Sequence, residues 1–262
     1  MKAGPVYRDA NGQQAFSGQT NGRSEIMPFI MKNVVPWGRT FDEYRKMFSL
    51  SDAELESHIA CFGDGVASFN AECDMQGGHV TSFDPVYRFS CDRLELVLEE
   101  AKRRLIEKTC HEGHGNGRSG VERDINELQK RHMTAVEIFM DDFEEGKKQG
   151  RYIDYELPYR IPCPDNCFDL GLSSYFLLSS AKPGINFHYQ ALEEMLRICH
   201  EVRIFPIVDM HGRETGLARK VIRRFAGSHD LWICKTAYHC AGNHNDMLVI
   251  RNVFKPSASL LH

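Results

Sequence analysis

A glycine turn between an apolar run and a helical pattern constrains the fold of this chain more than any other feature. Residues 59–62 (Ile-Ala-Cys-Phe) lead into Gly63-Asp64-Gly65, and residues 66–73 lead out with apolar side chains spaced three and four apart. Residues 79–83 then alternate and end on Asp84, about 20 residues after the first glycine. Strand, glycine turn, helix, strand and terminal acid predict a βαβ unit that binds a nucleoside.

A hairpin is the alternative interpretation of the same residues, because Asp-Gly is a favoured two-residue turn between antiparallel strands. Two details argue against it. Val66, Phe69 and Cys73 follow a helical period where a hairpin partner would alternate at two. Gly77-Gly78 then supplies a stop for a helix.

Length and charge limit the class of protein. A chain of 262 residues can bury one sizeable core, as one domain with an insertion. The net charge of −4 gives no polyanion-binding surface, so we expect no nucleic-acid partner. No apolar stretch approaches the roughly 20 residues of a membrane span, so we expect no membrane partner. Nine scattered cysteines, together with an N-terminus that lacks a signal-peptide core, predict a reduced, cytoplasmic protein.

The chain divides into an arm and a domain. Residues 1–33 are rich in Gly, Asn, Gln and Ser and predict a flexible N-terminal arm, so the domain spans 34–262. Capping boxes at Thr40/Glu43 and Ser51/Glu54 predict two short helices, the first from 41 to 48. Two long helices over about 91–148, broken near 109–117, predict an inserted lid over the substrate.

The remaining segments predict alternating strands and helices. Strands are expected at 58–62, 79–83, 151–157, 168–174, 202–209, 231–237 and 246–253, and further helices at 186–201 and 215–226. The loop 238–245 is short enough to join an antiparallel pair. We therefore expect an α/β fold: a doubly wound, mostly parallel seven-stranded sheet with an antiparallel last strand.

Three segments resemble class I S-adenosylmethionine-dependent methyltransferases. The turn at 63–65 is similar to the family's first motif, and Phe83-Asp84-Pro85 to the acidic end of its second strand. Residues 161–170 (IPCPDNCFDL) resemble the stretch that enters its fourth strand. The resemblance covers about 37–253. Residues 35–39 (VPWGR) resemble an uncharacterised bacterial branch of the family.

The resemblance implies a Rossmann-like methyltransferase fold, S-adenosyl-L-methionine as cofactor, and a transferase that methylates an acceptor. Gly63, Gly65, Asp84 and Pro85 would then line the cofactor, with Asp84 on the ribose hydroxyls. The alternative for Asp84 is a solvated residue at a strand end. In the first motif the family's acid is replaced by Ile59 and its first glycine by Cys61.

Further residues are candidates for the site. Asp64 is expected either to contact the cofactor amine or to face water. Tyr155 and Glu156 would lie in the adenine region. Ser173 and Ser174 would bind cofactor, or only pack at the strand end, and Tyr175 would orient the acceptor as the catalytic candidate.

Arg39 and Trp37, which precede the first helix, are the last candidates for the cofactor site. Arg39 would pair with the cofactor carboxylate, and Trp37 would close over the site through a cation–π contact or only anchor the arm. The clusters Cys110/His111/His114 and His239/Cys240/His244 lack paired Cys-x-x-Cys motifs, so we expect no metal.

We therefore expect methyl transfer to a small-molecule acceptor enclosed by the helical insertion. The enzymatic alternative is a nicotinamide-dependent oxidoreductase, for which Ser68 half satisfies the fingerprint. The other alternative is a non-catalytic protein that binds the nucleoside through a degenerate site. The sequence carries no prediction of the acceptor or of the oligomeric state.

Overall fold

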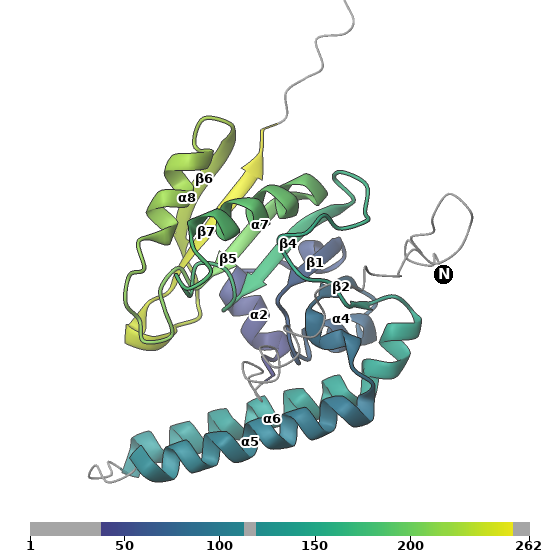
Figure 1. Cartoon of the computed structure of the whole chain (residues 1–262), viewed down its shortest axis with the longest axis vertical. Helices are drawn as coiled ribbons and strands as arrows, with labels where there is room; N and C mark the ends of the chain where they lie inside the picture. Colours follow the sequence, from purple (N-terminus) through teal and green to yellow (C-terminus); the bar gives the residue numbers. More distant parts are fainter. Residues whose placement is uncertain (1–37, 113–118, 254–262) are drawn as a thin grey trace, which may run out of the picture.

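The computed structural model describes residues 38–112 and 119–253, which form a seven-stranded sheet covered by helices (Figure 1). The strand order is β3-β2-β1-β4-β5-β7-β6. The strands are β1 (His58–Phe62), β2 (His79–Phe83), β3 (Tyr152–Ile153), β4 (Phe168–Ser174), β5 (Cys199–Phe205), β6 (His229–Lys235) and β7 (Asp246–Asn252). Strands β1 to β5 pair in parallel, whereas β7 is antiparallel to both β5 and β6. The predicted mostly parallel sheet with an antiparallel last strand is confirmed.

Alternating side chains of the central strands supply both faces of the core. Ala60 and Phe62 of β1 pack in one apolar cluster with α7 (Ile185–Ile198) and α8 (Leu217–Phe225). Ile59 and Cys61 pack in the other with α2 (Phe41–Phe48) and α4 (Phe69–Met75). A strand buried on both faces is typical of doubly wound sheets.

Local sequence signals explain where the first helices begin. Thr40 and Ser51 each accept a hydrogen bond from the backbone of the glutamate three residues on, and that glutamate bonds back. Both predicted capping boxes are therefore confirmed, at the starts of α2 and of α3 (Asp52–Leu55).

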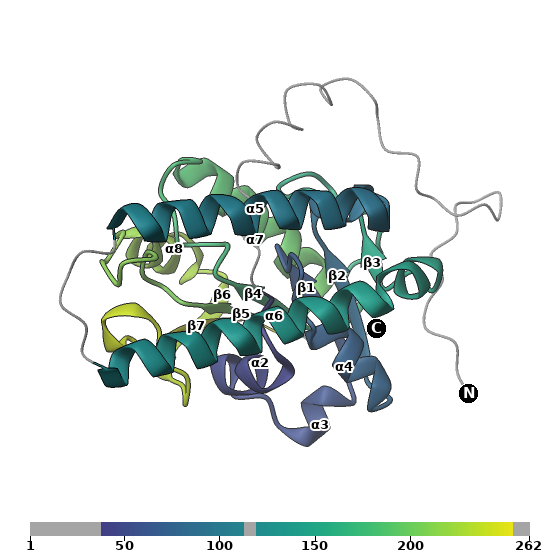
Figure 2. The same ribbon diagram turned by 90° about the horizontal axis from the view of Figure 1, so that it is seen from below.

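Two long helices, α5 (Cys91–Glu112) and α6 (Ser119–Lys148), form the predicted insertion. The 3₁₀ helix η1 (Pro85–Arg88) joins β2 to α5. Val86 and Tyr87 of η1, together with Val66 after β1, pack in one apolar cluster with residues of α5 and α6. Figure 2 shows both helices crossing in front of the edge where the parallel strands end. The insertion therefore lies at the carboxyl edge of the sheet.

Several predicted bounds were wrong. The third strand was expected over 151–157, but β3 is the two residues Tyr152–Ile153, because it is an edge strand that pairs only with the end of β2. The fifth strand was expected over 202–209, yet α7 ends at Ile198 and β5 runs from Cys199 to Phe205, immediately before Pro206. Proline has no N–H to continue a ladder. The helix after the glycine turn starts at Phe69, later than expected.

The helix expected to break near 109 continues to Glu112 in α5, and smaller differences of one to three residues separate the other expected and observed ends. The predicted arm, residues 1–33, lies outside the described residues.

Candidate cofactor site

The glycine turn lies at the carboxyl end of β1, next to the end of β2. Gly63 and Gly65 both have positive φ, 68° and 57°, which side chains with a Cβ rarely adopt. The Gly63 N–H donates to the carbonyl of Phe83 over 2.9 Å, so the turn is fixed to the end of β2. The conformation predicted for a nucleoside-binding turn is therefore present.

Asp84 joins the two strand ends through its carboxylate. Oδ2 accepts from the Gly65 N–H over 3.0 Å, and Oδ1 accepts from the Val86 N–H over 2.8 Å. A carboxylate has about four acceptor positions, so further hydrogen bonds remain available to it. Burial raises the pKa of Asp84 to about 6, against the lowering effect of the two N–H donors. The alternative of a simply solvated strand-end acid is wrong, because the side chain is partly buried and doubly bonded.

Asp64 turns into the protein. Its side chain accepts hydrogen bonds from the Tyr44 hydroxyl and, over 2.7 Å, from the Ser82 hydroxyl. Only 8% of the residue is exposed. Burial raises its pKa to about 6. The expectation that Asp64 faces water is wrong, and its two oxygens are already engaged in fixing the turn to α2 and β2.

The two glycines differ in what surrounds them. A Cβ added at Gly65 would meet no atom within 4 Å, so its backbone faces open space. A Cβ at Gly63 would lie 2.5 Å from Cγ of Phe176. The residues present therefore fit a ligand at Gly65 and Asp84, whereas the space beside Gly63 holds an aromatic ring.

The two serines at the end of β4 are engaged in local packing. Ser173 is fully buried and its Oγ accepts from the Leu177 N–H over 3.2 Å. The Ser174 hydroxyl lies 3.8 Å from the sulfur of Met47. These contacts are those of the strand-end packing that was the alternative to a cofactor role.

The other candidates near the end of β2 are partly exposed. Pro85 is the first residue of η1. Tyr155 packs against the apolar cluster that contains Phe62, and burial raises the pKa of Glu156. Trp37 lies outside the described residues.

A second group of polar side chains gathers beside the glycine turn, and we name it the Arg39 cluster. It consists of Arg39, Glu43, His132, Tyr175 and Tyr238. These residues come from the start of α2, from α6, from the end of β4 and from the loop after β6. They are distant in sequence and meet only through the fold.

Glu43 is the centre of this cluster. Its Oε1 lies 2.9 Å from Nε2 of His132 and accepts from the Tyr238 hydroxyl over 2.9 Å. It also accepts from Nη1 of Arg39 over 3.3 Å. Burial acts to raise the pKa of Glu43, but His132, Arg39 and the Thr40 N–H hold it at about 2. Glu43 is therefore a buried anion near neutral pH, and too weak a base to remove a proton from an acceptor.

Arg39 and Tyr175 form a stacked pair. The guanidinium carbon lies 4.1 Å from the centre of the Tyr175 ring, and Nη1 donates to the Tyr238 hydroxyl over 3.0 Å. Burial alone would lower the pKa of Arg39, but the facing tyrosines and Glu43 raise it. This cation–π contact between Arg39 and Tyr175 was not predicted, and the one expected of Trp37 lies outside the described residues. Arg39 and Tyr175 were both predicted site residues, and the fold brings them together.

Sequence reasoning missed three members of the cluster: Glu43, His132 and Tyr238. Glu43 was recognised only as a capping residue, a function that uses its Oε2 and leaves Oε1 for the cluster. His132 and Tyr238 carry no local signal of a site. Their proximity to Glu43 depends on how α6 and the loop after β6 fold back.

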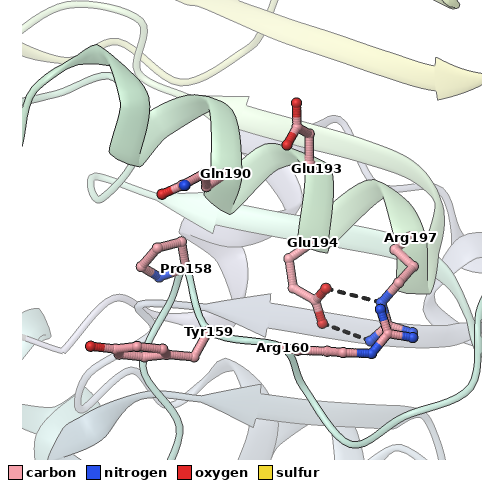
Figure 3. Close-up of a pocket in the computed structure, with 7 residues that line it drawn as sticks. All are labelled: Pro158, Tyr159, Arg160, Gln190, Glu193, Glu194 and Arg197. Carbon is pink, nitrogen blue, oxygen red and sulfur yellow. Dashed lines mark hydrogen bonds and ion pairs between the residues drawn. The ribbon is translucent and has the colours of Figure 1, made fainter.

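A surface groove of about 500 Å³ lies away from these residues, between α7 and the loop before β4 (Figure 3). Arg197 and Glu194 form an ion pair on its wall, at 2.6 Å. Arg197 also donates to the carbonyls of Ile161 and Cys163, both over 2.8 Å. In the segment 161–170 that resembles the methyltransferase family, residues 161–167 thus form a loop held by Arg197 of α7, and the last three residues begin β4.

The described residues provide neither a metal-binding cluster nor a membrane-spanning helix. They contain no group of three or more His, Cys, Asp or Glu side chains arranged to hold a metal ion. Within 38–112 and 119–253, no helix combines the length and apolar character needed to cross a membrane.

Comparison with known proteins finds one relative and several solved structures. The chain is 29% identical over 225 residues to the uncharacterized protein MJ0045 of Methanocaldococcus jannaschii. The match covers 84% of this chain and 97% of that protein. No protein-family model matches the chain.

The solved structures are distant methyltransferases. The methyltransferase domain of bacterial CtHen1 is 11% identical with a TM-score of 0.43, over 80% of this chain and 99% of that chain. Magnesium protoporphyrin IX methyltransferase ChlM from Synechocystis PCC 6803, with bound SAM, is 11% identical with a TM-score of 0.39. The match covers 91% of this chain and 87% of that chain. A putative S-adenosyl-L-methionine-dependent methyltransferase from Methanococcus maripaludis is 14% identical with a TM-score of 0.37. The match covers 92% of this chain and 99% of that chain.

Likenesses at these TM-scores add no argument of their own. The order and directions of the strands define the fold, which is the Rossmann-like fold expected for class I methyltransferases.

Proposed function

We propose that this protein is an S-adenosylmethionine-dependent methyltransferase that acts on a small-molecule acceptor. The observation that carries the proposal is the link between Gly65 and Asp84 at the carboxyl edge of the sheet. Ligands of open α/β sheets bind at this edge, where the strand order reverses beside β1. The Asp84 carboxylate retains acceptor capacity for two ribose hydroxyls, and the Gly65 backbone faces open space.

The cofactor, when bound, would supply a methyl group on a sulfonium centre for in-line displacement. The protein then has to align the acceptor and exclude water, with no nucleophile of its own. Asp84 would orient the ribose, and the Arg39 cluster would contact the acceptor beyond the end of β4. Within the cluster Tyr175 is the residue proposed to orient the acceptor.

A small acceptor is proposed because α5 and α6 lie across the strand ends. Val86 and Tyr87, which follow Asp84, are buried against these helices. A negative net charge of −4 also opposes binding of a polyanion.

The strand arrangement favours this function over the nicotinamide-dependent alternative. A dinucleotide-binding Rossmann sheet has its strands in the order 3-2-1-4-5-6 and is mostly parallel. Here β7 is inserted antiparallel between β5 and β6. The non-catalytic alternative rests on the replacement of the family's acid and first glycine by Ile59 and Cys61. Both side chains are buried in the core, so neither of them contacts a ligand directly.

The proposal is tested by isothermal titration with S-adenosylhomocysteine, the product of the cofactor. We expect Asp84→Asn to weaken binding at least about tenfold, because an amide loses the charge and one acceptor for the ribose hydroxyls. Asp230→Asn is the matched control, since Asp230 is an exposed carboxylate on β6, several strands away from β2 in the sheet. It should bind like the parent.

Heat from NAD and none from S-adenosylhomocysteine would replace the proposal with the oxidoreductase. Binding without methyl release across a broad panel of small acceptors would support the non-catalytic alternative. Equal loss of affinity in both variants would show that Asp84 does not bind the ribose hydroxyls.

A further inference from the structure

The segment that follows β4 connects the two halves of the candidate site. Tyr175 and Leu178 have positive φ, 53° and 65°, which is costly for residues with a side chain. The segment is nevertheless tightly held: the Tyr175 N–H donates to the Phe205 carbonyl over 2.8 Å, and Ser179 Oγ donates to the Phe176 carbonyl over 2.9 Å. Strained backbone that the surroundings hold in place is typical of functional sites.

Phe176 faces the glycine turn. Three atoms of its side chain lie within 2.8 Å of the position that a Cβ on Gly63 would take. The side chain is only partly buried, and its ring meets Phe187 edge to face at 6.1 Å. Phe176 therefore covers the backbone of the glycine that the proposed cofactor needs to approach.

Tyr175, the adjacent residue, faces the other half of the site. Its ring lies under Arg39, and that guanidinium is bonded to Tyr238 and Glu43. Through Glu43 the contact extends to His132 on α6. Neighbouring residues thus contact the glycine turn on one side and the Arg39 cluster on the other.

We propose that Phe176 is displaced from Gly63 when the cofactor binds, and that Tyr175 transmits this movement to the Arg39 cluster. This inference rests on the proposed function and deepens it. Two groups cannot occupy the same face of Gly63, so the ring leaves when the ligand approaches that backbone. Tyr175 is the residue before Phe176 in the same strained segment. A movement of Phe176 therefore changes the stacking of Tyr175 on Arg39 at the same time. The acceptor side is therefore completed only after the cofactor is bound, and binding is ordered.

Phe176→Ala tests the displacement. If the ring competes with the cofactor, only the fraction of molecules with the ring displaced can bind, and removing the ring raises the apparent affinity. For a displaced fraction of roughly one tenth, S-adenosylhomocysteine should bind about tenfold more tightly to Phe176→Ala than to the parent. Tyr189→Ala is the matched control, because Tyr189 is a partly buried aromatic residue that packs on Phe225 instead. It should bind like the parent.

Unchanged or weaker binding by Phe176→Ala, with a folded protein, would overturn the displacement. Phe176→Leu provides a second variant that replaces the ring with a smaller branched side chain, which keeps Cβ, Cγ and Cδ1 near Gly63. It should bind with an affinity between those of the parent and Phe176→Ala.

The contact itself is tested without any ligand by a double-mutant cycle in thermal unfolding. Gly63→Ala should lower the unfolding temperature less in the Phe176→Ala background than in the parent, because the close contacts with Cγ and Cδ1 are absent and only the Cβ of residue 176 remains close. Additive effects would show that the contact does not exist. If no variant binds S-adenosylhomocysteine but the cycle shows coupling, the proposed function fails while the contact stands.

Transmission is tested by hydrogen exchange. In the parent, S-adenosylhomocysteine should change amide exchange in α6 around His132. In Tyr175→Ala binding should persist while this change is lost. If S-adenosylhomocysteine still changes amide exchange in α6 of Tyr175→Ala as it does in the parent, Tyr175 does not transmit the movement. A residue with a purely structural role would leave binding and the exchange change coupled.

Discussion

Asp64 and Asp84 are 20 residues apart in sequence, each just after a strand end, and have different roles. Each has a pKa raised to about 6 by burial, and each is bound by two donors. Asp64 bonds to side chains of α2 and β2 inside the core, whereas Asp84 bonds to backbone N–H groups and remains partly exposed. A carboxyl with such a raised pKa stabilises the fold when protonated. Its contribution is complete below the ordinary value of 3.8 and is lost as the pH rises through about 6.

Asp64→Asn should therefore gain stability relative to the parent as the pH rises. An amide keeps one acceptor and the shape of the carboxyl but never ionises. We expect the difference in free energy of unfolding, variant minus parent, to be about 1 kcal/mol larger at pH 7.5 than at pH 5. Denaturant unfolding at the two pH values measures this difference. Asp230→Asn, an exposed carboxyl on β6, is the control. An equal change in both variants would contradict the role assigned to Asp64.

At the scale of elements, α6 is attached to the start of α2 by polar contacts of His132 and by close backbone packing. His132 is 1% exposed and lies against Glu43. A Cβ on Gly38 would come within 3.0 Å of the Val136 nitrogen, so only glycine permits this approach of α6. Further along, Phe139 and Phe143 pack with Tyr87. The insertion is therefore fixed to the strand ends at several points, and His132 is its contact with the Arg39 cluster.

His132→Ala should loosen α6 locally. Removing one partner of a buried hydrogen bond costs about 1–3 kcal/mol. Amide exchange in residues 128–140 should become faster, while exchange in β4 and β5 stays unchanged. Met133→Ala is the control, because Met133 is 44% exposed on the same helix. Equal acceleration in both variants, or none in His132→Ala, would show that the contact does not hold α6.

At the scale of the whole molecule, the sheet and the insertion define one region for ligands. The carboxyl ends of β1, β2 and β4 carry the glycine turn, Asp84 and Tyr175, and the helices α5 and α6 cross the same edge (Figure 2). A ligand in this region would contact the sheet and the insertion together, so binding should stabilise the whole fold.

S-adenosylhomocysteine should raise the unfolding temperature of the parent. At 100 times the dissociation constant, binding to the folded state adds about 2.7 kcal/mol. For a chain of this size that corresponds to roughly 5–10 °C. Thermal unfolding with equal concentrations of S-adenosylhomocysteine and NAD makes the comparison. A larger shift with NAD would contradict the proposed cofactor.

Much of the fold could be predicted because local signals and burial agree in it. The bounds of β1, β2, β4 and α2 were predicted correctly, since each combines a clear apolar period with a turn or cap. The extent of β3 could not be predicted, because Tyr155 and Leu157 keep an alternating pattern yet pack on the core from a loop. The site was predicted less completely: Arg39, Tyr175 and Asp84 lie at the carboxyl edge, whereas Asp64, Ser173 and Ser174 are engaged in the interior.

The sequence by itself determined the βαβ unit, the order of elements and the glycine turn beside Asp84. These depend on residues close together in the chain, where apolar period, caps and glycine conformations act directly. Only the tertiary structure decided that Glu43 meets His132 and Tyr238, and that Phe176 covers Gly63. These contacts join segments up to 195 residues apart, and they depend on how the strands are ordered and how α6 folds back across them.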